Sequence, residues 1–479
     1  MWQKKPSRRD FLRTLGLVTG AGSLGLLGCT GEPQPGNGAA PGEGPGAEDY
    51  SGPTPTVVVR RDVTSPEAQA DLEAYAQAVE ALKAASGSVT WQEQALIHQN
   101  HCPHGNAFFL PWHRGYLHYF ERICRELSGK ADFALPYWNW STQATIPAPF
   151  WQGTLNDTTR RIGQNTPMPP GAVGQSVIDS ILAITDFQTF GSVYVTDDCA
   201  SDPFQRSRCG TGELEGIPHN TVHGFIGGNM GTFMSPLDPI FWLHHCNVDR
   251  LWMEWNQNNQ NPNNPDWSGF VFEQNFVDPE GQPQDISVEQ TFSTQALGYR
   301  YDTQPEAESE ALEAAPSPGR VVASAESANA AEARHGEALR IPVELTPEVR
   351  ERLQARLGAE EAVSAATFRL TLGGVPTPSE QIGVQVFVGA AEAPEGTEAA
   401  SHVGTFTFFP IEGEHAAHEN HFLFDIGEEL AAAGWDGEGP LPVHVRSVPL
   451  GDAAAGEEAV PTAAVAPKTV RIEIIEPGS

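Results

Sequence analysis

Basic residues are scarce in this chain, which holds 28 Lys and Arg against 61 Asp and Glu and carries a formal net charge of −33. Nucleic acids and anionic membrane surfaces are themselves negatively charged, so neither is an expected partner. Much of the acidity follows residue 300 and therefore says little about the chemistry of the first half of the chain.

Long hydrophobic runs are also missing. The apolar stretch from Leu15 to Leu27 is shorter than the roughly 20 residues that a membrane-spanning helix needs, so no transmembrane span is expected. It follows the segment SRRDFLR at 7–13, which resembles a twin-arginine export signal. The segment LLGC at 26–29 resembles a lipoprotein cleavage box. We therefore expect residues 1–29 to direct export, which gives either a periplasmic or cell-envelope lipoprotein anchored at Cys29 or a secreted protein cut elsewhere.

Cysteine is limited to six residues. An exported protein can form disulfides, and Cys199 and Cys209, ten apart in a polar segment, are the expected pair. Cys124 and Cys246 lie in segments with helical periodicity and are expected to be buried apolar residues.

Composition divides the 479 residues into five parts. After the signal, the Gly/Pro-rich residues 30–56 predict a flexible tether. Residues 57–302 hold the aromatic and helical segments and predict a folded core domain. The Ala/Glu/Ser-rich residues 303–337 predict a disordered linker open to proteases, and 338–479 form a final domain.

Periodicity predicts the elements of the two folded domains. Helices are expected over 65–84, 90–98, 112–127 and 237–255, the first one capped by Ser65 with Pro66 at its first position. Alternating apolar and polar residues predict strands at 339–345, 368–372, 384–388 and 470–474. The aromatic turn at 135–140 is expected to pack in the core. The expected fold is mainly α, a helical bundle followed by a C-terminal antiparallel β-sandwich.

Two groups of histidines stand out within the helical segments. His219 and His223 are four apart and share one face of a helix, so both rings can reach one metal ion. His244 and His245 are adjacent and point in different directions, so only one of them is expected to join that pair. The second group lies upstream, at 98–113, and contains His98, His101, His104 and His113. Two groups indicate two facing metal ions, and all-imidazole ligands suit copper or zinc.

The surrounding residues extend this pattern. The matching segments are CPH at 102–104, FLPWHR at 109–114, HN at 219–220, VH at 222–223, DPIF at 238–241, HH at 244–245 and VDRLW at 248–252. Together they resemble the type-3, or binuclear, copper family of tyrosinases, catechol oxidases and haemocyanins, over roughly Val57 to Tyr301. A match at this many positions is specific by the standards of short motifs.

The resemblance implies a ligand set for two copper ions. Copper A would be held by His98, His104 and His113, with His101 as the alternative first ligand. Copper B would be held by His219, His223 and His245, with His244 beside them. Asp249 and Arg250 are interpreted as a structural pair that orients the ligand helices or rings.

Further residues acquire roles from the same resemblance. Glu215 and Asn220 match the pair that orders a water and helps deprotonate a phenol, although a carboxylate at a helix start would look the same. Phe233 matches an aromatic gate over copper A, with core packing as the alternative. Cys102 is placed to form a thioether with His104; a disulfide to Cys124 or an unmodified thiol is the alternative.

The implied function is that of a polyphenol oxidase, in which copper and dioxygen oxidise small o-diphenols to o-quinones. Glu215 and Asn220 favour ortho-hydroxylation of monophenols as well, whereas Phe233 favours diphenols only. Residues 404–409 of the C-terminal domain are expected to supply an aromatic lid over the site. An oxygen carrier like haemocyanin, an o-aminophenol oxidase, a dinuclear zinc hydrolase and a metal-free binding lipoprotein are the alternatives.

Overall fold

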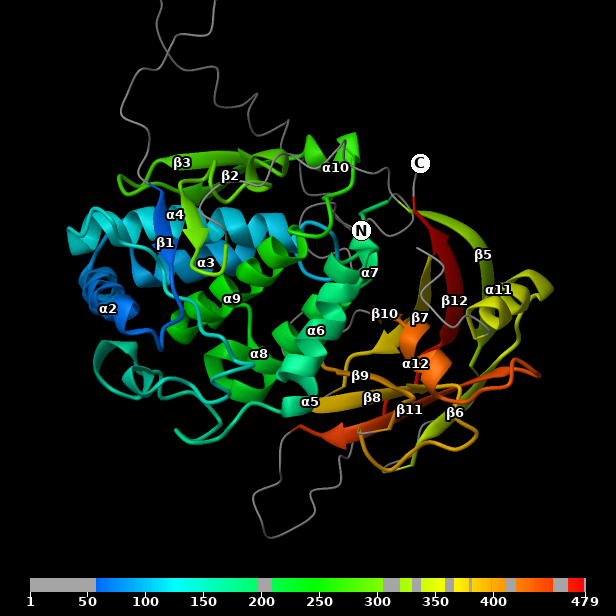
Figure 1. Cartoon of the computed structure of the whole chain (residues 1–479). Coiled ribbons are helices and arrows are strands. Elements are labelled where there is room, and N and C mark those ends of the chain that lie inside the picture. The colour runs from blue at the N-terminus through cyan, green and yellow to red at the C-terminus, as the bar shows by residue number, and fades with distance from the viewer. Residues whose placement is uncertain are drawn as a thin grey trace, which may run out of the picture. The chain divides into compact units, whose positions relative to one another are not determined.

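The computed structural model describes residues 57–196, 209–304, 319–329, 337–357, 366–378, 381–397, 399–409, 419–450 and 464–477. Residues from Pro55 to Ser479 form one compact unit. Helices dominate up to residue 304 and two larger sheets follow (Figure 1). The predicted export signal and tether lie outside the described residues. Among the described helices, none has the length and apolar character that crossing a bilayer requires.

The helical region contains ten helices among the described residues, together with short 3-10 turns and two small sheets. In chain order its elements are β1 (Val58–Arg60), α2 (Gln69–Ala84), α3 (Trp91–His101), α4 (Phe109–Ser128), α5 (Pro170–Val173), α6 (Gln175–Ala183), α7 (Phe187–Gly191), a π-helix (Glu215–His219), α8 (Asn220–Ile226), α9 (Ile240–Trp255), α10 (Pro265–Ser268), β2 (Val271–Val277), β3 (Pro283–Ser287) and β4 (Tyr299–Tyr301). β1 pairs with β4, which joins the two ends of this region.

The four predicted helices are present, with shifted ends. Ser65 caps a 3-10 turn that precedes α2, and Thr90 caps α3 by accepting the backbone N–H of Glu93. α3 runs past the predicted end to His101, where Cys102 takes an extended conformation. Cys102 precedes Pro103, and the residue before a proline avoids the helical region, so the helix ends there.

A buried charge network holds the helical core together. Arg60 donates to Glu121 at 2.9 Å and to Asp249 at 3.2 Å, and Arg114 also pairs with Asp249. The hydroxyl groups of Tyr299 and Tyr301 donate to the same Asp249 carboxylate. Burial raises the pKa of Asp249, but Arg114 and Arg60 outweigh it and leave this pKa below its usual value. Asp249 thus ties α9 to α4, β1 and β4.

Asp249 has the predicted structural role between helices, but it does not pair with its neighbour Arg250. Arg250 pairs instead with Glu254, one turn further along α9. Adjacent helical residues point about 100° apart, so neighbours in sequence rarely meet, whereas residues four apart lie on one face.

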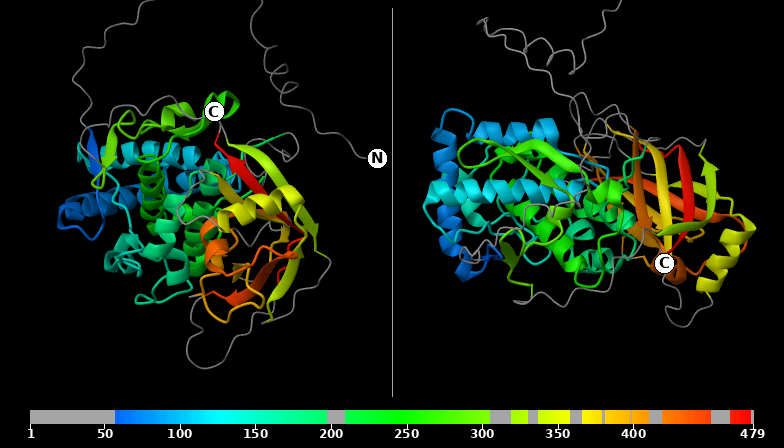
Figure 2. Two further views of the ribbon diagram at one scale, coloured as in Figure 1. Left: turned by 45° about the vertical axis from the view of Figure 1, so that its right-hand side comes forward. Right: turned by 90° about the horizontal axis from the view of Figure 1, so that it is seen from above.

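The C-terminal region contains two four-stranded antiparallel sheets, which the two views of Figure 2 show from other sides. One sheet has the order β10-β7-β12-β5, with β10 (Glu419–Asp425), β7 (Thr367–Pro376), β12 (Thr469–Glu476) and β5 (Arg320–Ala328). The other has the order β6-β11-β8-β9, with β6 (Leu339–Val343), β11 (Leu441–Pro449), β8 (Ile382–Val388) and β9 (His402–Phe406). Two helices, α11 (Pro347–Leu357) and α12 (Gly427–Ala432), accompany them. All four predicted strands are present.

The prediction of a linker over residues 303–337 is wrong for its middle part. Residues 320–328 form β5, which pairs antiparallel with β12 along its length. The inward residues Ala323 and Ala325 are small, so the strand shows little of the large-residue alternation that marks other strands. The sheet region therefore begins before residue 338.

The sheet region contacts the helical region through backbone hydrogen bonds. Thr211 donates to the carbonyl of His421 at 2.8 Å and accepts from the N–H of Leu423 at 3.0 Å, so it extends the edge of β10. The N–H of Asp425 donates to Glu213 at 2.7 Å, and that of Thr407 donates to Gly216 at 3.2 Å. Thr211 and Glu213 lie just ahead of the π-helix that carries His219, and Gly216 lies within it.

Four carboxyl groups near this contact line a cavity of about 190 Å³, those of Glu213, Asp425, Glu428 and Glu429. Burial raises the pKa of Asp425 to about 6 and that of Glu429 to about 8, and it raises the pKa of Glu213 well above its ordinary value. Glu213, Asp425 and Glu429 therefore hold protons in the folded chain at pH values where the unfolded chain has lost them.

We expect folding stability to fall as pH rises from about 5 to 8, in part because folded Glu429 keeps its proton until about pH 8 while an unfolded glutamate loses it near pH 4.3. Glu429→Gln cannot ionise and should reduce this loss, which thermal unfolding at pH 5 and pH 8 would measure. Glu428→Gln, a change at the exposed neighbour, should keep most of the wild-type dependence. Identical pH dependence in wild type and Glu429→Gln would contradict the expectation.

Candidate metal centre

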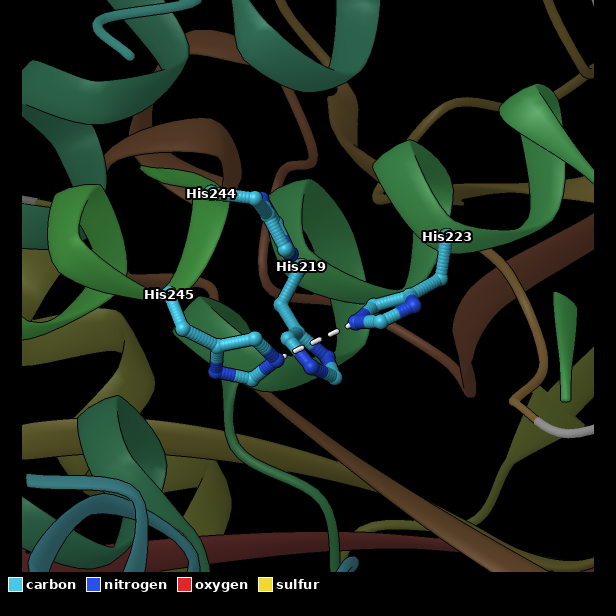
Figure 3. Close-up of side chains that lie close together, drawn as sticks. All are labelled: His219, His223, His244 and His245. Carbon is cyan, nitrogen blue, oxygen red and sulfur yellow. Dashed lines mark hydrogen bonds between the residues drawn. The ribbon is translucent and has the colours of Figure 1, made fainter. Parts of the chain in front are cut away.

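Seven histidines meet inside the helical region, and all of them are buried. They come from α3, the loop after it, α4, the π-helix, α8 and α9, in the order His98, His104, His113, His219, His223, His244 and His245. Figure 3 shows the last four, whose rings converge from the π-helix, α8 and α9.

The ring nitrogens fall into overlapping groups in which potential ligand atoms lie within 4.8 Å of one another. These groups are His219 with His223, His244 and His245, then His98 with Cys102 and His104, and finally His98 with His113 and His245. His101 belongs to none of the groups found among the described residues. The structure therefore brings His98, and not the alternative His101, to the other histidines.

The helix that carries His219 is wider than predicted. Residues 215–219 form a π-helix with Pro218 inside it, and α8 begins directly afterwards. Pro218 has no N–H to donate to the carbonyl four residues back, and such a gap favours the wider turn. His219 and His223 still face each other, with ring centroids 4.5 Å apart.

Hydrogen bonds on the outer side of the rings decide which nitrogen faces inward. The Nδ1 atoms of His98, His113 and His223 lie 2.7, 2.8 and 2.7 Å from the backbone carbonyls of Phe233, Phe109 and Met230. A carbonyl can only accept, so each Nδ1 carries the hydrogen and each Nε2 presents a lone pair. Ligand histidines in metal sites are oriented in this same way.

His219 follows the same rule through a side chain. Its Nδ1 lies 2.9 Å from the amide oxygen of Asn220, whose amide nitrogen donates to the carbonyl of Thr407 at 3.2 Å. The second bond fixes which end of the Asn220 amide faces His219. A residue of the C-terminal region thereby helps to orient a ring of the centre.

His244 is oriented the opposite way. Its Nδ1 lies 3.1 Å from the indole Nε1 of Trp140, which can only donate. The hydrogen of neutral His244 therefore sits on Nε2, so this nitrogen offers no lone pair. The turn at 135–140 was predicted only to pack in the core, but Trp140 also sets the tautomer of His244.

The protein leaves several of these nitrogens without hydrogen-bond partners among the described residues. They are both ring nitrogens of His104, Nε2 of His113, His219 and His244, and Nδ1 of His245. A buried polar atom without a partner costs about 1–3 kcal/mol, so such a cluster calls for a ligand. Burial lowers the pKa of His113 and His223 to about 3, so both rings are neutral, as metal ligands must be. Neutral imidazole donors fit the copper ions that the sequence predicts.

Two aromatic rings cover the histidines. The ring centroid of Phe233 lies 6.3 Å from that of His98 and 5.7 Å from that of His104. Phe409, from the C-terminal region, lies 4.9 Å from His104, 4.4 Å from His223 and 5.7 Å from Phe233. The aromatic segment predicted to reach the site therefore does so through Phe409.

Glu215 is buried next to the histidines, and both of its carboxylate oxygens accept hydrogen bonds from the protein. The donors are the N–H of Gly105 and the hydroxyl of Ser192, each at 2.7 Å. Ser192, Trp140 and Thr407 have no motif in the sequence that would mark them, because their contacts join segments 23 to 187 residues apart.

The cysteines divide as expected where the structure describes them. Cys102 is buried, and its sulfur lies within 4.8 Å of ligand nitrogens of His98 and His104. Cys124 and Cys246 are buried thiols, and burial raises the pKa of both. Cys209 is disulfide-bonded, whereas its predicted partner Cys199 lies outside the described residues.

Comparison with known proteins finds one matching family model, the common central domain of tyrosinase, over residues 84–207 and 180–258. These ranges include all seven buried histidines of the centre, three in the first range and four in the second.

Sequence relatives match between about a third and a half of the chain. Tyrosinase HcTyr1 of a Hahella species is 38% identical over 233 residues, which are 42% of this chain and 47% of that protein. Catechol oxidase B of Solanum tuberosum is 32% identical over 45% of this chain and 43% of its own length. The tyrosinase of Streptomyces glaucescens is 36% identical over 32% of this chain and 63% of its own length. The chain thus spans about half the length of the first relatives that it matches.

A solved structure extends the likeness to the whole fold. The latent apple tyrosinase superimposes with a TM-score of 0.62 at 20% identity, covering 89% of this chain and 98% of that one. At this identity the match speaks for the fold alone, including its C-terminal sheets. The central-domain match and the relatives lead to one conclusion: the helical part of this chain belongs to the tyrosinase and catechol oxidase family of type-3 copper proteins.

Proposed function

We propose that this protein is a polyphenol oxidase that uses two copper ions and dioxygen to oxidise small o-diphenols to o-quinones. The observation that carries the proposal is the convergence of seven buried histidines, four of which turn Nε2 inward because an oxygen acceptor holds Nδ1–H. The tyrosinase and catechol oxidase relatives support the same reaction class.

The proposed ligands are six of the seven histidines. His98, His104 and His113 would hold copper A, and His219, His223 and His245 would hold copper B. His244 is assigned a supporting role, because its inward nitrogen carries a hydrogen when Trp140 donates to the other one. When bound, the copper ions supply oxygen binding and electron transfer from the phenol.

The chain's own residues would position the phenol. Phe233 lies against the copper A histidines and can narrow the approach or stack on an aromatic substrate. Asn220 holds His219 through its amide oxygen. Glu215 is proposed as the group that accepts a proton from the phenol, through a water, which would permit ortho-hydroxylation of monophenols. A thioether between Cys102 and His104 remains a prediction, and the sulfur lies within 4.8 Å of a ring nitrogen of His104.

The C-terminal region is proposed to act as a lid. The ring of Phe409 occupies the space between His104, His223 and Phe233, where a phenol would have to enter. Removal or loosening of this region would then raise activity. Export by the twin-arginine route, with or without a lipid anchor at Cys29, completes the proposal from the sequence.

The function is tested with purified, copper-loaded protein before and after limited proteolysis. A catechol and the matching monophenol are compared by oxygen consumption and quinone absorbance. We expect catechol turnover that rises after proteolysis. Oxygen binding without turnover would favour a haemocyanin-like carrier. A faster reaction with o-aminophenol would favour an o-aminophenol oxidase, and zinc in place of copper would favour a hydrolase.

Removing single histidines tests the ligand assignment. His245→Ala should reduce bound copper from two ions per chain to about one, because a proposed ligand is lost. His244→Ala should retain two ions, since its Nε2 is proposed to carry a hydrogen. Copper per chain is measured by mass spectrometry of the metal. Equal loss of copper in His244→Ala and His245→Ala would contradict the assignment.

Phe409→Ala tests the lid in the uncleaved chain. Opening the space beside His104 and His223 should raise catechol turnover by about tenfold, which corresponds to 1.4 kcal/mol of activation free energy. Phe408→Leu changes the neighbouring ring, which packs against Phe406 and Phe422 and not against the histidines. That control should stay near the wild-type rate; equal rates for wild type and Phe409→Ala would refute the lid.

A further inference from the structure

His104 differs from the other histidines of the centre in how its ring is held. His98, His113, His219 and His223 each have an oxygen acceptor at Nδ1. Both nitrogens of His104 are buried without a hydrogen-bond partner among the described residues. His104 also lies in the loop between α3 and α4, so no helix fixes its backbone. Its orientation must be set by the segment around it.

That segment is attached to the rest of the protein directly after His104. The N–H of Gly105 donates to Glu215 at 2.7 Å, and the carbonyl of Gly105 accepts from Gly210 at 3.0 Å. Gly105 has φ of +69°, a conformation that glycine adopts without strain. The two peptide groups on either side of Gly105, the first of which follows His104 directly, are therefore each held by a hydrogen bond.

Glu215 is in turn held by Ser192. The hydroxyl of Ser192 donates to the second carboxylate oxygen at 2.7 Å and accepts the N–H of Gly212 at 2.9 Å. One donor and one acceptor partner fix the direction of this hydroxyl. Ser192 is fully buried, and a Cβ on Gly212 would come within 2.5 Å of its backbone nitrogen, so the two segments are in close contact.

The backbone of Ser192 is strained. Its φ is +83°, and it is one of two non-glycine residues with positive φ among the described residues. Such a conformation costs of order 1–3 kcal/mol in a non-glycine residue. Glycine would relieve the strain but would remove the hydroxyl, so the serine at this position is explained by its contact with Glu215.

We propose that Ser192 is a positioning residue of the metal centre: with Glu215 it clamps the Gly105 peptide and so fixes the ring of His104. The proposal rests on the proposed copper function. It gives Glu215 a task beside proton transfer, because the carboxylate links the loop of one metal site to the helix that carries His219 of the other. Loss of the clamp should loosen copper A selectively.

The test compares Ser192→Ala, which removes the hydroxyl and keeps the strain, with Ser192→Gly, which removes both. The full chain is loaded with copper and dialysed against a chelator while copper per chain is followed. We expect both variants to lose one of two ions at least tenfold faster than wild type. The remaining lone Cu(II), with its unpaired electron, should give an electron paramagnetic resonance signal that grows as the first ion leaves.

The control is Ser235→Ala, which removes another buried serine hydroxyl, one without a hydrogen-bond partner among the described residues; it should keep both ions as wild type does. Thermal unfolding of the metal-free proteins separates local from global effects, because Ser192→Gly should be at least as stable as Ser192→Ala. If both variants lost copper at the wild-type rate, or lost both ions at the same time, the clamp alone would be overturned. A wild-type protein that binds no copper would overturn the proposed function together with the clamp.

Discussion

The hydrogen bonds from imidazole Nδ1 atoms to oxygen acceptors are the constraint on which this structure depends. A neutral imidazole has one hydrogen, and a carbonyl that accepts it on the outer side forces the lone pair to the inner side. The carbonyls of Phe109, Met230 and Phe233 perform this task for three rings. The fold must therefore place backbone segments as accurately as it places the histidines themselves.

The helices meet that requirement through a second buried network. Asp249 on α9 collects Arg60, Arg114, Tyr299 and Tyr301, which come from β1, α4 and β4. Removing one partner of such a network leaves a buried charge and is costly, by about 3–5 kcal/mol. Because α4 carries His113 and α9 carries His245, this network also sets the spacing between the two halves of the metal centre.

The C-terminal sheets contribute to the centre as well as covering it. Thr407 fixes the amide of Asn220, which holds His219, while Phe409 two residues later lies among the rings. Thr211 extends the edge of β10 just ahead of the π-helix. A change in the docking of the sheets would thus affect His219 through these hydrogen bonds, and it would also open the space that the ring of Phe409 fills.

Local pattern was sufficient for much of this protein. The periodicity around His113 and His245, the cap at Thr90 and the alternation in β7 and β8 each depend on neighbours within one element, so the sequence determined these elements and the histidine groups by itself. The sequence did not predict strand β5, because its inward residues are only alanines. It did not predict the π-helix either, because one proline altered a regular four-residue spacing.

Only the tertiary structure decided how the rings are held. No residue near His244 in the sequence indicates its contact with Trp140, and none near Glu215 indicates its contacts with Ser192 and Gly105. Asp249 pairs with the distant Arg114 and not with its neighbour Arg250. The sequence determined that imidazoles would gather on helices, because spacing along a helix is local. Which nitrogen faces inward was decided by donors and acceptors that chain folding brings from distant segments, and no local pattern encodes those contacts.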